Sequence, residues 1–374
     1  MSATDSFGML ETLDAREMPA FVEAIILADR VPMVYGAPGI GKSEIIRELA
    51  HRMGFALLDV RLAQMLPEQI AGVQYVDASH TATVALKPSL IGSIERLGKE
   101  SGKPVMVLWD ELTLASSETL SAALEMLLDR RVGGHPVPAG TVMVCAGNRP
   151  QDTADAMLLN PPVRARLISC VYKPSTKDTA AYIAGKFKSA IGAAMAEYIE
   201  TPTARGLVTR ESIGDDAAFY TPRGVDMALT AIEASRARAK GKAASDNKLT
   251  NVERAILAGS VGKPLASGFA SFLSIRANVK PAAELLDKAA TAPVPQTDES
   301  GNAAAIAQLQ GMMAFVRANP ARVNDMLTYL ERCSSQHLFE FLSSVSRVKS
   351  DASLLTQTIR GKRMFSDAGV AFRE

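Results

Sequence analysis

Hydrophobic residues in the first half of the chain gather in short runs, separated by stretches with helical spacing. Such runs occupy residues 31–36, 56–62, 104–112, 141–148 and 166–173. Each run is long enough for one strand, and strands with few polar positions are typical of parallel sheets that helices cover on both faces. The pattern therefore predicts an α/β fold built on a parallel sheet.

Helical spacing of apolar residues appears between several of these runs. Residues 19–30 and residues 43–54 show this spacing, each as an amphipathic pattern. A third helix is predicted over residues 116–129, where Ser116 or Ser117 is the candidate N-cap. The order of strand, loop and helix around residues 31–54 is the part of the pattern that bears most on function.

Two other stretches carry turn residues. Residues 71–88 contain two β-prone pieces around a polar stretch, and we expect them to form a hairpin inserted into the α/β domain. Residues 130–140, "RRVGGHPVPAG", contain a Gly-Gly pair and two prolines, which fit a hairpin or loop better than a helix.

The pattern of apolar residues changes after about residue 174, where alanine-rich stretches with helical spacing replace the short apolar runs. A tract rich in proline and polar residues at 291–302 separates a last helical portion. We therefore expect an α/β core at 1–173, a helical second domain at 174–290 and a helical C-terminal extension at 291–374.

Charge and composition narrow the function classes. The 374 residues include 41 Lys and Arg against 40 Asp and Glu, a formal net charge of +1, so no global field attracts nucleic acid or an anionic membrane. The chain has no apolar run of about 18 residues and begins without a signal-peptide pattern. We expect a cytoplasmic protein with no membrane segment.

The cysteines and histidines indicate neither a disulfide framework nor a metal site. Cys145, Cys170 and Cys333 are widely spaced and odd in number, which predicts buried free thiols. The four histidines lack metal-ligand spacing.

The first apolar run ends in a complete phosphate-binding motif of the form GxxxxGK[ST]. A loop without bulky side chains turns its backbone N–H groups toward phosphate oxygens, and the helix N-terminus behind it adds partial positive charge. We predict that the lysine reaches the β- and γ-phosphates of a nucleotide and that the serine hydroxyl binds Mg²⁺. The motif and the residue after it are Gly36, Ala37, Pro38, Gly39, Ile40, Gly41, Lys42, Ser43 and Glu44.

A pair of acids closes the strand predicted at 104–112. Asp110 is the candidate second ligand of Mg²⁺, and Glu111 is the candidate base that orients or deprotonates the attacking water. A solvated Asp-Glu turn before a helix is the alternative. Asn148 closes the next apolar run, where its amide could contact the γ-phosphate or that water, or could simply form a turn after glycine.

These motifs together resemble an AAA+ ATPase, most of all its MoxR branch. The phosphate-binding loop, "VLWDEL", "AGN", "NPPVRARL" and "YTPRG" occur in the order of that family, over roughly residues 15–290. The resemblance implies an AAA+ core followed by an α-helical lid, ATP and Mg²⁺ as ligands, and a homo-oligomeric ring of six subunits. It makes Asn148 the sensor of the γ-phosphate, and the insert at 71–88 also fits the branch.

The resemblance assigns roles to three arginines. Arg166 aligns best with the arginine finger that reaches the nucleotide of the neighbouring subunit, and Arg164 competes for this role because "VRARL" departs from the Asp-Arg-Phe of many relatives. Arg223 in "TPRG" corresponds to the second sensor, which contacts the γ-phosphate from the lid.

The predicted function is ATP hydrolysis in a ring that remodels or activates a partner protein or complex. In relatives the partner often carries a von Willebrand A domain. One alternative is a motor acting on nucleic acid, for which the basic segment at 236–248 lacks interleaved aromatic residues. Another is a scaffold that assembles on binding ATP and hydrolyses little of it, which an intact Glu111 disfavours.

Overall fold

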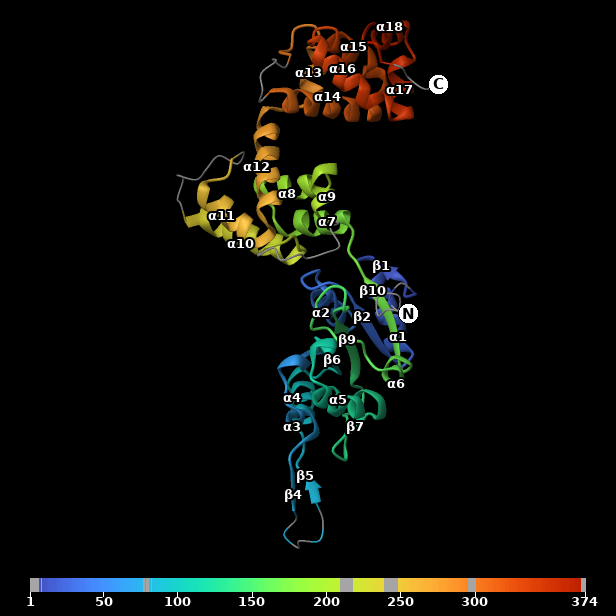
Figure 1. The fold of residues 1–374 in the computed structure, drawn as a ribbon, viewed down its shortest axis with the longest axis vertical. Helices are drawn as coiled ribbons and strands as arrows, with labels where there is room; N and C mark the ends of the chain where they lie inside the picture. Colours follow the sequence, from blue (N-terminus) through green and yellow to red (C-terminus); the bar gives the residue numbers. More distant parts are fainter. Residues whose placement is uncertain are drawn as a thin grey trace. The chain divides into compact units, whose positions relative to one another are not determined.

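The computed structural model describes residues 7, 9–76, 78, 81, 83–208, 218–238, 248–294 and 301–370. The chain divides into two compact units (Figure 1). The first consists of Met1–Lys242 with Asn251–Ser267, and the second of Ala243–Thr250 with Gly268–Glu374. Each unit is described below by itself.

In the described residues, six parallel strands form the sheet of the first unit, as the apolar runs predicted. The short edge strand β1 was not predicted. Across the sheet the order is β1 (Thr12–Leu13), β10 (Leu167–Tyr172), β2 (Val31–Tyr35), β9 (Val142–Gly147), β6 (Val105–Asp110) and β3 (Ala56–Arg61).

The register of the central strands brings their carboxyl ends together. Tyr35 of β2 pairs with Gly147 of β9. On the other side of β9, Trp109 of β6 pairs with Cys145. The residues that follow β2, β6 and β9 therefore leave the sheet at one edge, where ligands bind in parallel α/β sheets.

Helices cover both faces of this sheet, and successive strand residues point to opposite faces. On one face, α1 (Glu17–Leu27) and α2 (Lys42–Arg52) pack on alternate strand residues such as Met106 and Leu108. On the other, α4 (Ser89–Ser101) and α5 (Ser117–Asp129) pack on Val107 and Trp109. The burial of both faces explains why the strands have so few polar positions.

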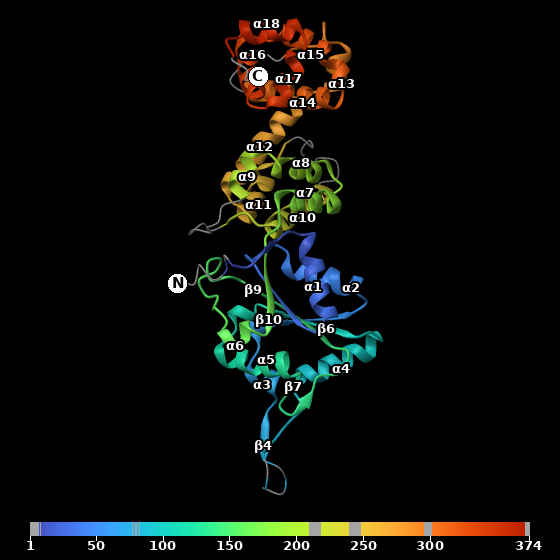
Figure 2. The same cartoon turned by 90° about the vertical axis from the view of Figure 1, so that its right-hand side faces the viewer.

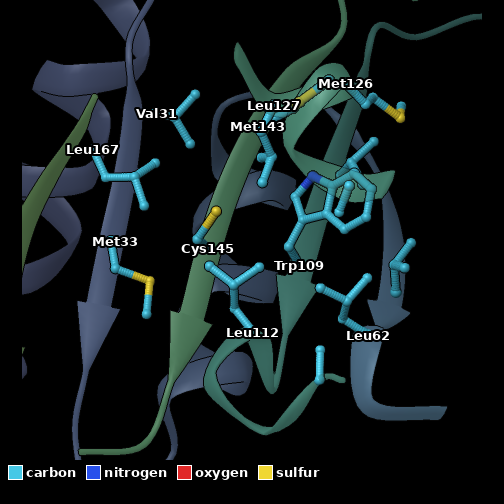
Figure 3. Close-up of a cluster of buried hydrophobic side chains, with 14 of the residues drawn as sticks. Val31, Met33, Leu62, Trp109, Leu112, Met126, Leu127, Met143, Cys145 and Leu167 are labelled. Atoms are coloured by element: carbon cyan, nitrogen blue, oxygen red, sulfur yellow. The ribbon is translucent and has the colours of Figure 1, made fainter. Parts of the chain in front are cut away.

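The indole of Trp109 lies within the second of these cores (Figure 3). Leu62, Leu112 and Met143 surround it, and the side chains of Met33 and Cys145 extend the same layer toward β2. Trp109 is fully buried, and it directly precedes Asp110, so the packing of the indole anchors the strand end that carries the acids.

Both stretches that carry turn residues, at 71–88 and 130–140, form hairpins. In the predicted insert, β4 (Gln74–Val76) pairs antiparallel with β5 (Thr83–Ala85), and this hairpin extends beyond α3 (Pro67–Ala71) in Figure 1 and Figure 2. Between α5 and β9, β7 (Arg131–Val132) pairs with β8 (His135–Pro136). Ser116, rather than Ser117, caps α5, because its side chain accepts from the N–H of Thr119.

Helices follow the sheet in the first unit, as the alanine-rich stretches after about residue 174 predicted. They are α7 (Thr176–Lys186), α8 (Ala190–Ile199), α9 (Pro202–Val208), α10 (Pro222–Arg238), α11 (Asn251–Val261) and the start of α12 (Lys263–Asn278), whereas the short helix α6 (Pro161–Arg164) lies before β10. In the basic segment at 236–248, Arg236 pairs with the buried Glu253, through a 2.7 Å contact from Nε to Oε1. Lys240 and Lys242 lie outside the described residues.

The second unit is helical and has its own apolar core. Met312, Phe341 and Phe365 are buried there. After α12, its helices are α13 (Ala282–Asp287), α14 (Gly301–Ala318), α15 (Val323–Leu330), α16 (Ser335–Ser346), α17 (Lys349–Thr356) and α18 (Ile359–Asp367). The three-domain division at 173 and 290 stays a prediction.

The thiols are free, and Cys145 and Cys170 are buried, as predicted, whereas Cys333 is partly exposed. Within the described ranges, every helix is too short or too polar to cross a bilayer.

Gly361, in the first turn of α18, gives a test of packing in the second unit. A Cβ at this position would lie 1.9 Å from the carbonyl oxygen of Leu355, so Gly361→Ala should destabilise the unit by about 1–3 kcal/mol or more. Gly311→Ala in α14 is the matched control, because a Cβ there meets nothing within 4 Å, and it should stabilise by up to about 1 kcal/mol. Denaturant unfolding monitored by circular dichroism would measure both, and equal stability of the two variants would contradict the close approach at Gly361.

Candidate functional site

The phosphate-binding motif forms the connection between β2 and α2. Gly39 and Gly41 have φ values of +75° and +94°, which L side chains rarely adopt. A Cβ on Gly36 would lie 2.7 Å from the carbonyl oxygen of Tyr172. The glycines therefore permit both the backbone conformation and the close approach of β10 to the loop.

Lys42, the first residue of α2, turns back beneath the loop. Its Nζ donates to the carbonyl oxygens of Gly36 at 2.7 Å and Ala37 at 2.8 Å, and to Oδ1 of Asn148 at 3.0 Å. Burial lowers the pKa of Lys42 to about 8, against the opposing effect of the carboxylates of Asp110 and Asp152. The ammonium group thus lies where phosphate oxygens would replace its present acceptors and favour its charged form.

The other residues of the motif lie around Lys42. Ser43 donates from Oγ to Oδ2 of Asp110 at 2.5 Å, so the loop meets the end of β6 directly. Ile40 packs partly against the core under α2, and Pro38, between Ala37 and Gly39, is partly buried. Glu44 pairs with Arg47 one turn later on α2.

The residues Asp110 and Glu111 end β6 in an unusual conformation. Glu111 has a φ of +58°, and its backbone N–H donates to Oδ1 of Asp110 at 2.9 Å. A left-handed conformation is uncommon for a glutamate, and backbone strain of this kind gathers at functional sites. The turn directs the chain out of the sheet immediately after the acid pair.

Asn148 directly follows β9 and is buried. Besides the contact of its side chain with Lys42, its backbone N–H donates to Oγ1 of Thr113 at 2.9 Å. The Thr113 hydroxyl donates in turn to the carbonyl oxygen of Asn148 at 2.9 Å. Sequence reasoning missed Thr113, because a threonine in "ELTLA" carries no pattern of its own.

A second pair that sequence reasoning missed lies beside Asn148. The guanidinium of Arg149 donates from Nε and one Nη to both carboxylate oxygens of Asp152, at 2.6 and 2.7 Å, and the Asp152 side chain is only 6% exposed. Both charges act on the pKa of Lys42, in opposite directions. The spacing of three residues was the available signal, since it is common for paired charges in a turn.

The helical part of the first unit reaches the loop through the start of α10. The backbone N–H of Arg223 donates to the carbonyl oxygen of Gly39 at 3.1 Å. Thr221, which precedes α10, lies so close that a Cβ on Gly39 would be 3.1 Å from its side chain. The Arg223 guanidinium is near enough to lower the pKa of Lys42, so the structure brings this predicted residue to the site.

The two arginines considered for the finger differ in exposure. Arg166 is exposed, just beyond the short helix α6. Arg164 is partly buried, and its Nε has no hydrogen-bond acceptor among the described residues. Within the described part of this single chain, neither side chain forms a hydrogen bond with Lys42, Asp110 or Asn148, so which of the two is the finger stays a prediction.

A cavity of about 730 Å³ opens beside the loop. Its lining includes Gly39, Ser43 and Asp110 from the sheet edge and Arg223 from α10. This volume lies in the range of ordinary ligand sites. The Ser43 hydroxyl and the Asp110 carboxylate are adjacent hard oxygen donors of the kind that Mg²⁺ takes together with waters. The residues present therefore fit a nucleotide with Mg²⁺.

The sheet topology, the loop and the acidic strand end define a P-loop nucleotide-binding domain. Residues 32–166 match the profile of the family described as "ATPase family associated with various cellular activities (AAA)", and this match supports an AAA-type ATPase domain in this part of the chain. No curated protein is similar enough in sequence to count as a relative.

A solved structure of a candidate ATPase from Cytophaga hutchinsonii ATCC 33406 is similar over 46% of this chain, with 16% sequence identity and a TM-score of 0.30. The aligned part spans 50% of that protein's chain, which is half of its length.

Affinity for ATP should fall as the pH rises through about 8, the pKa to which burial lowers Lys42 in the free protein. Only the ammonium form pairs with phosphate, so the complex holds a proton that the free protein loses above this pH. Affinity should then weaken by up to about tenfold per pH unit. Calorimetric titration from about pH 7 to about pH 9.5 would measure it.

Lys42→Arg is the control for this titration. Its guanidinium stays charged throughout the range, so its affinity should be lower than that of the parent protein but nearly independent of pH. If the affinity of the parent protein for ATP does not change over the same pH range, Lys42 does not titrate there or does not bind the phosphates.

Proposed function

We propose that the chain hydrolyses ATP to ADP and phosphate, with Mg²⁺. The observation that carries this proposal is the meeting of three chain segments at one point: Lys42 contacts Asn148 at 3.0 Å, and Ser43 contacts Asp110 at 2.5 Å. These segments supply a phosphate-binding cation, oxygen donors for a metal and a polar amide. Phosphoryl transfer requires chiefly this positioning and charge.

The residues of the site divide the work as follows. The backbone N–H groups of the loop and the ammonium of Lys42 bind the phosphates, and Ser43 and Asp110 hold Mg²⁺, which when bound neutralises charge on the phosphates. Glu111 orients and deprotonates the attacking water. The amide of Asn148 holds that water or the γ-phosphate in place, and Arg223 adds positive charge from α10.

We further propose that the chain works as a homo-oligomeric ring, a hexamer of the MoxR branch, in which Arg166 completes the site of the neighbouring subunit. Its exposure suits a residue that acts on another subunit, whereas the partly buried Arg164 suits a local role. The ring uses hydrolysis to remodel or activate a protein client, for which a protein with a von Willebrand A domain is the first candidate.

The roles of Lys42 and Glu111 should separate on substitution. Lys42→Ala should bind ATP at least about tenfold more weakly, because it removes the cation from the phosphates. Glu111→Gln should bind ATP like the parent protein but release phosphate about 100-fold or more slowly, because its amide accepts no proton. Phosphate-release assays and ATP titration measure the two effects, and parental turnover by Glu111→Gln would mean that another group is the base.

A finger acting between subunits gives a complementation test. Arg166→Ala keeps its nucleotide site but lacks the finger, and Lys42→Ala keeps the finger but loses the nucleotide site. Each variant alone should be nearly inactive, whereas a mixture of equal amounts should regain turnover, because about one quarter of randomly formed interfaces join the two intact halves.

Arg164→Ala is the matched control in this test. Mixed with Lys42→Ala it should give no gain beyond its own activity, which we expect to be near that of the parent protein. If Arg164→Ala is the variant that needs complementation and Arg166→Ala is active alone, the finger is Arg164. If neither mixture exceeds its components, the shared site is wrong.

A further inference from the structure

Thr113 holds both polar backbone groups of Asn148. It lies in the short 3-10 helix at Leu112–Leu114, immediately after the acid pair, and is only 1% exposed. Its hydroxyl accepts from the N–H of Asn148 and donates to the carbonyl oxygen of the same residue, both at 2.9 Å. A single side chain thus fixes the position and the orientation of the Asn148 backbone.

The main chain of Thr113 also contacts Met157, further along the segment that begins at Asn148. Its carbonyl oxygen accepts from the N–H of Met157 at 2.8 Å. The segment continues to Asn160, whose side chain caps α6 by accepting from the N–H of Val163 at 3.1 Å. Thr113 is therefore in contact with two points of the connection that leads from β9 to α6.

The side chain of Thr113 is closely confined. A Cβ on Gly147 would lie 2.8 Å from Oγ1 of Thr113 and 2.9 Å from its Cγ2. The glycine before Asn148 thus leaves just the room that the threonine occupies. A hydroxyl in this place can serve the Asn148 backbone only because position 147 lacks a side chain.

We propose that Thr113 is a positioning residue for Asn148 and so sets the geometry between the polar amide and the base. Thr113 lies two residues after Glu111, and the backbone that it holds presents Oδ1 of Asn148 to Nζ of Lys42 at 3.0 Å. The segment that follows β6 thereby positions both groups: it contains Glu111 itself, and it holds the amide of Asn148 through Thr113. This inference rests on the proposed function, in which Glu111 and Asn148 act on the same water and γ-phosphate.

Removing the hydroxyl leaves a buried N–H and a buried carbonyl of Asn148 without their partner. The backbone then moves toward other partners, and the amide moves with it. Misplacing a catalytic group by about 1 Å costs about 100-fold in rate. The Ser43–Asp110 contact and the contacts of Lys42 with the loop carbonyls do not involve Thr113, so binding of the β-phosphate should change less than binding of the γ-phosphate.

The test compares Thr113→Val, which keeps the shape and loses the hydroxyl, with Thr113→Ser, which keeps the hydroxyl. Thr113→Val should lower kcat about 10- to 100-fold and reduce the preference for a non-hydrolysable ATP analogue over ADP, with a smaller change in ADP affinity. Thr113→Ser should restore both to within about threefold of the parent protein.

Thr119→Val is the matched control. Thr119 is 2% exposed, and its hydroxyl donates to the carbonyl oxygen of Met65 at 3.1 Å, away from Asn148. This variant should lower the melting temperature to a similar extent while leaving kcat and the preference for the ATP analogue unchanged. If Thr113→Val does not fold, Thr113→Ala, which leaves room for a water, is measured in its place.

The outcomes separate this inference from the proposed function. Turnover by the parent protein that Glu111→Gln abolishes, together with parental kcat and ATP preference in Thr113→Val, would overturn the role of Thr113 alone. Equal losses of kcat in Thr113→Val and Thr113→Ser would overturn it too, because the hydroxyl would then be irrelevant. A parent protein that binds ATP without any turnover would overturn the proposed function instead.

Discussion

The ammonium group of Lys42 is buried beneath the phosphate-binding loop, with the carbonyl oxygens of Gly36 and Ala37 and the amide oxygen of Asn148 as acceptors. A buried charge is costly unless it is hydrogen-bonded, and burial has already lowered its pKa to about 8. The contact therefore constrains both partners: the loop must turn its carbonyls inward, and β9 must end at the height of the loop. A polyphosphate would suit this site, because its oxygens carry full negative charge, whereas the carbonyl oxygens carry only partial negative charge.

The parallel sheet makes that contact possible. The pairing of Tyr35 with Gly147 and of Trp109 with Cys145 aligns β2, β9 and β6, so that residues far apart in the sequence leave the sheet together. Packing of the indole in the core fixes the end of β6 (Figure 3). The positions of Asp110 and Glu111 at the sheet edge thus depend on the packing of Trp109 in the core, and a substitution near Trp109 should displace them.

The sequence predicted the strands well, because both faces of the sheet are buried and each strand is a nearly unbroken apolar run. Sequence reasoning missed α4, although Leu90, Ile91 and Ile94 recur at helical spacing and are buried; Gly92 and Gly98, which are poor helix formers, weaken the pattern. The loop and the acids were predictable because their spacing carries the chemistry. Thr113 was not, since its role arises from a contact across 35 positions with Asn148, and the exposures of Arg164 and Arg166 depend on the turn of a four-residue helix.

The central claim is that the loop, the acidic end of β6 and the amide after β9 form one phosphate site. A crystal structure of Glu111→Gln with ATP and Mg²⁺ tests this most directly. The account predicts the γ-phosphate between Lys42 and Asn148, with Lys42 released from the carbonyl oxygens of Gly36 and Ala37, and Mg²⁺ beside Ser43 and Asp110. ATP bound elsewhere, or bound while Lys42 keeps its present acceptors, would contradict it.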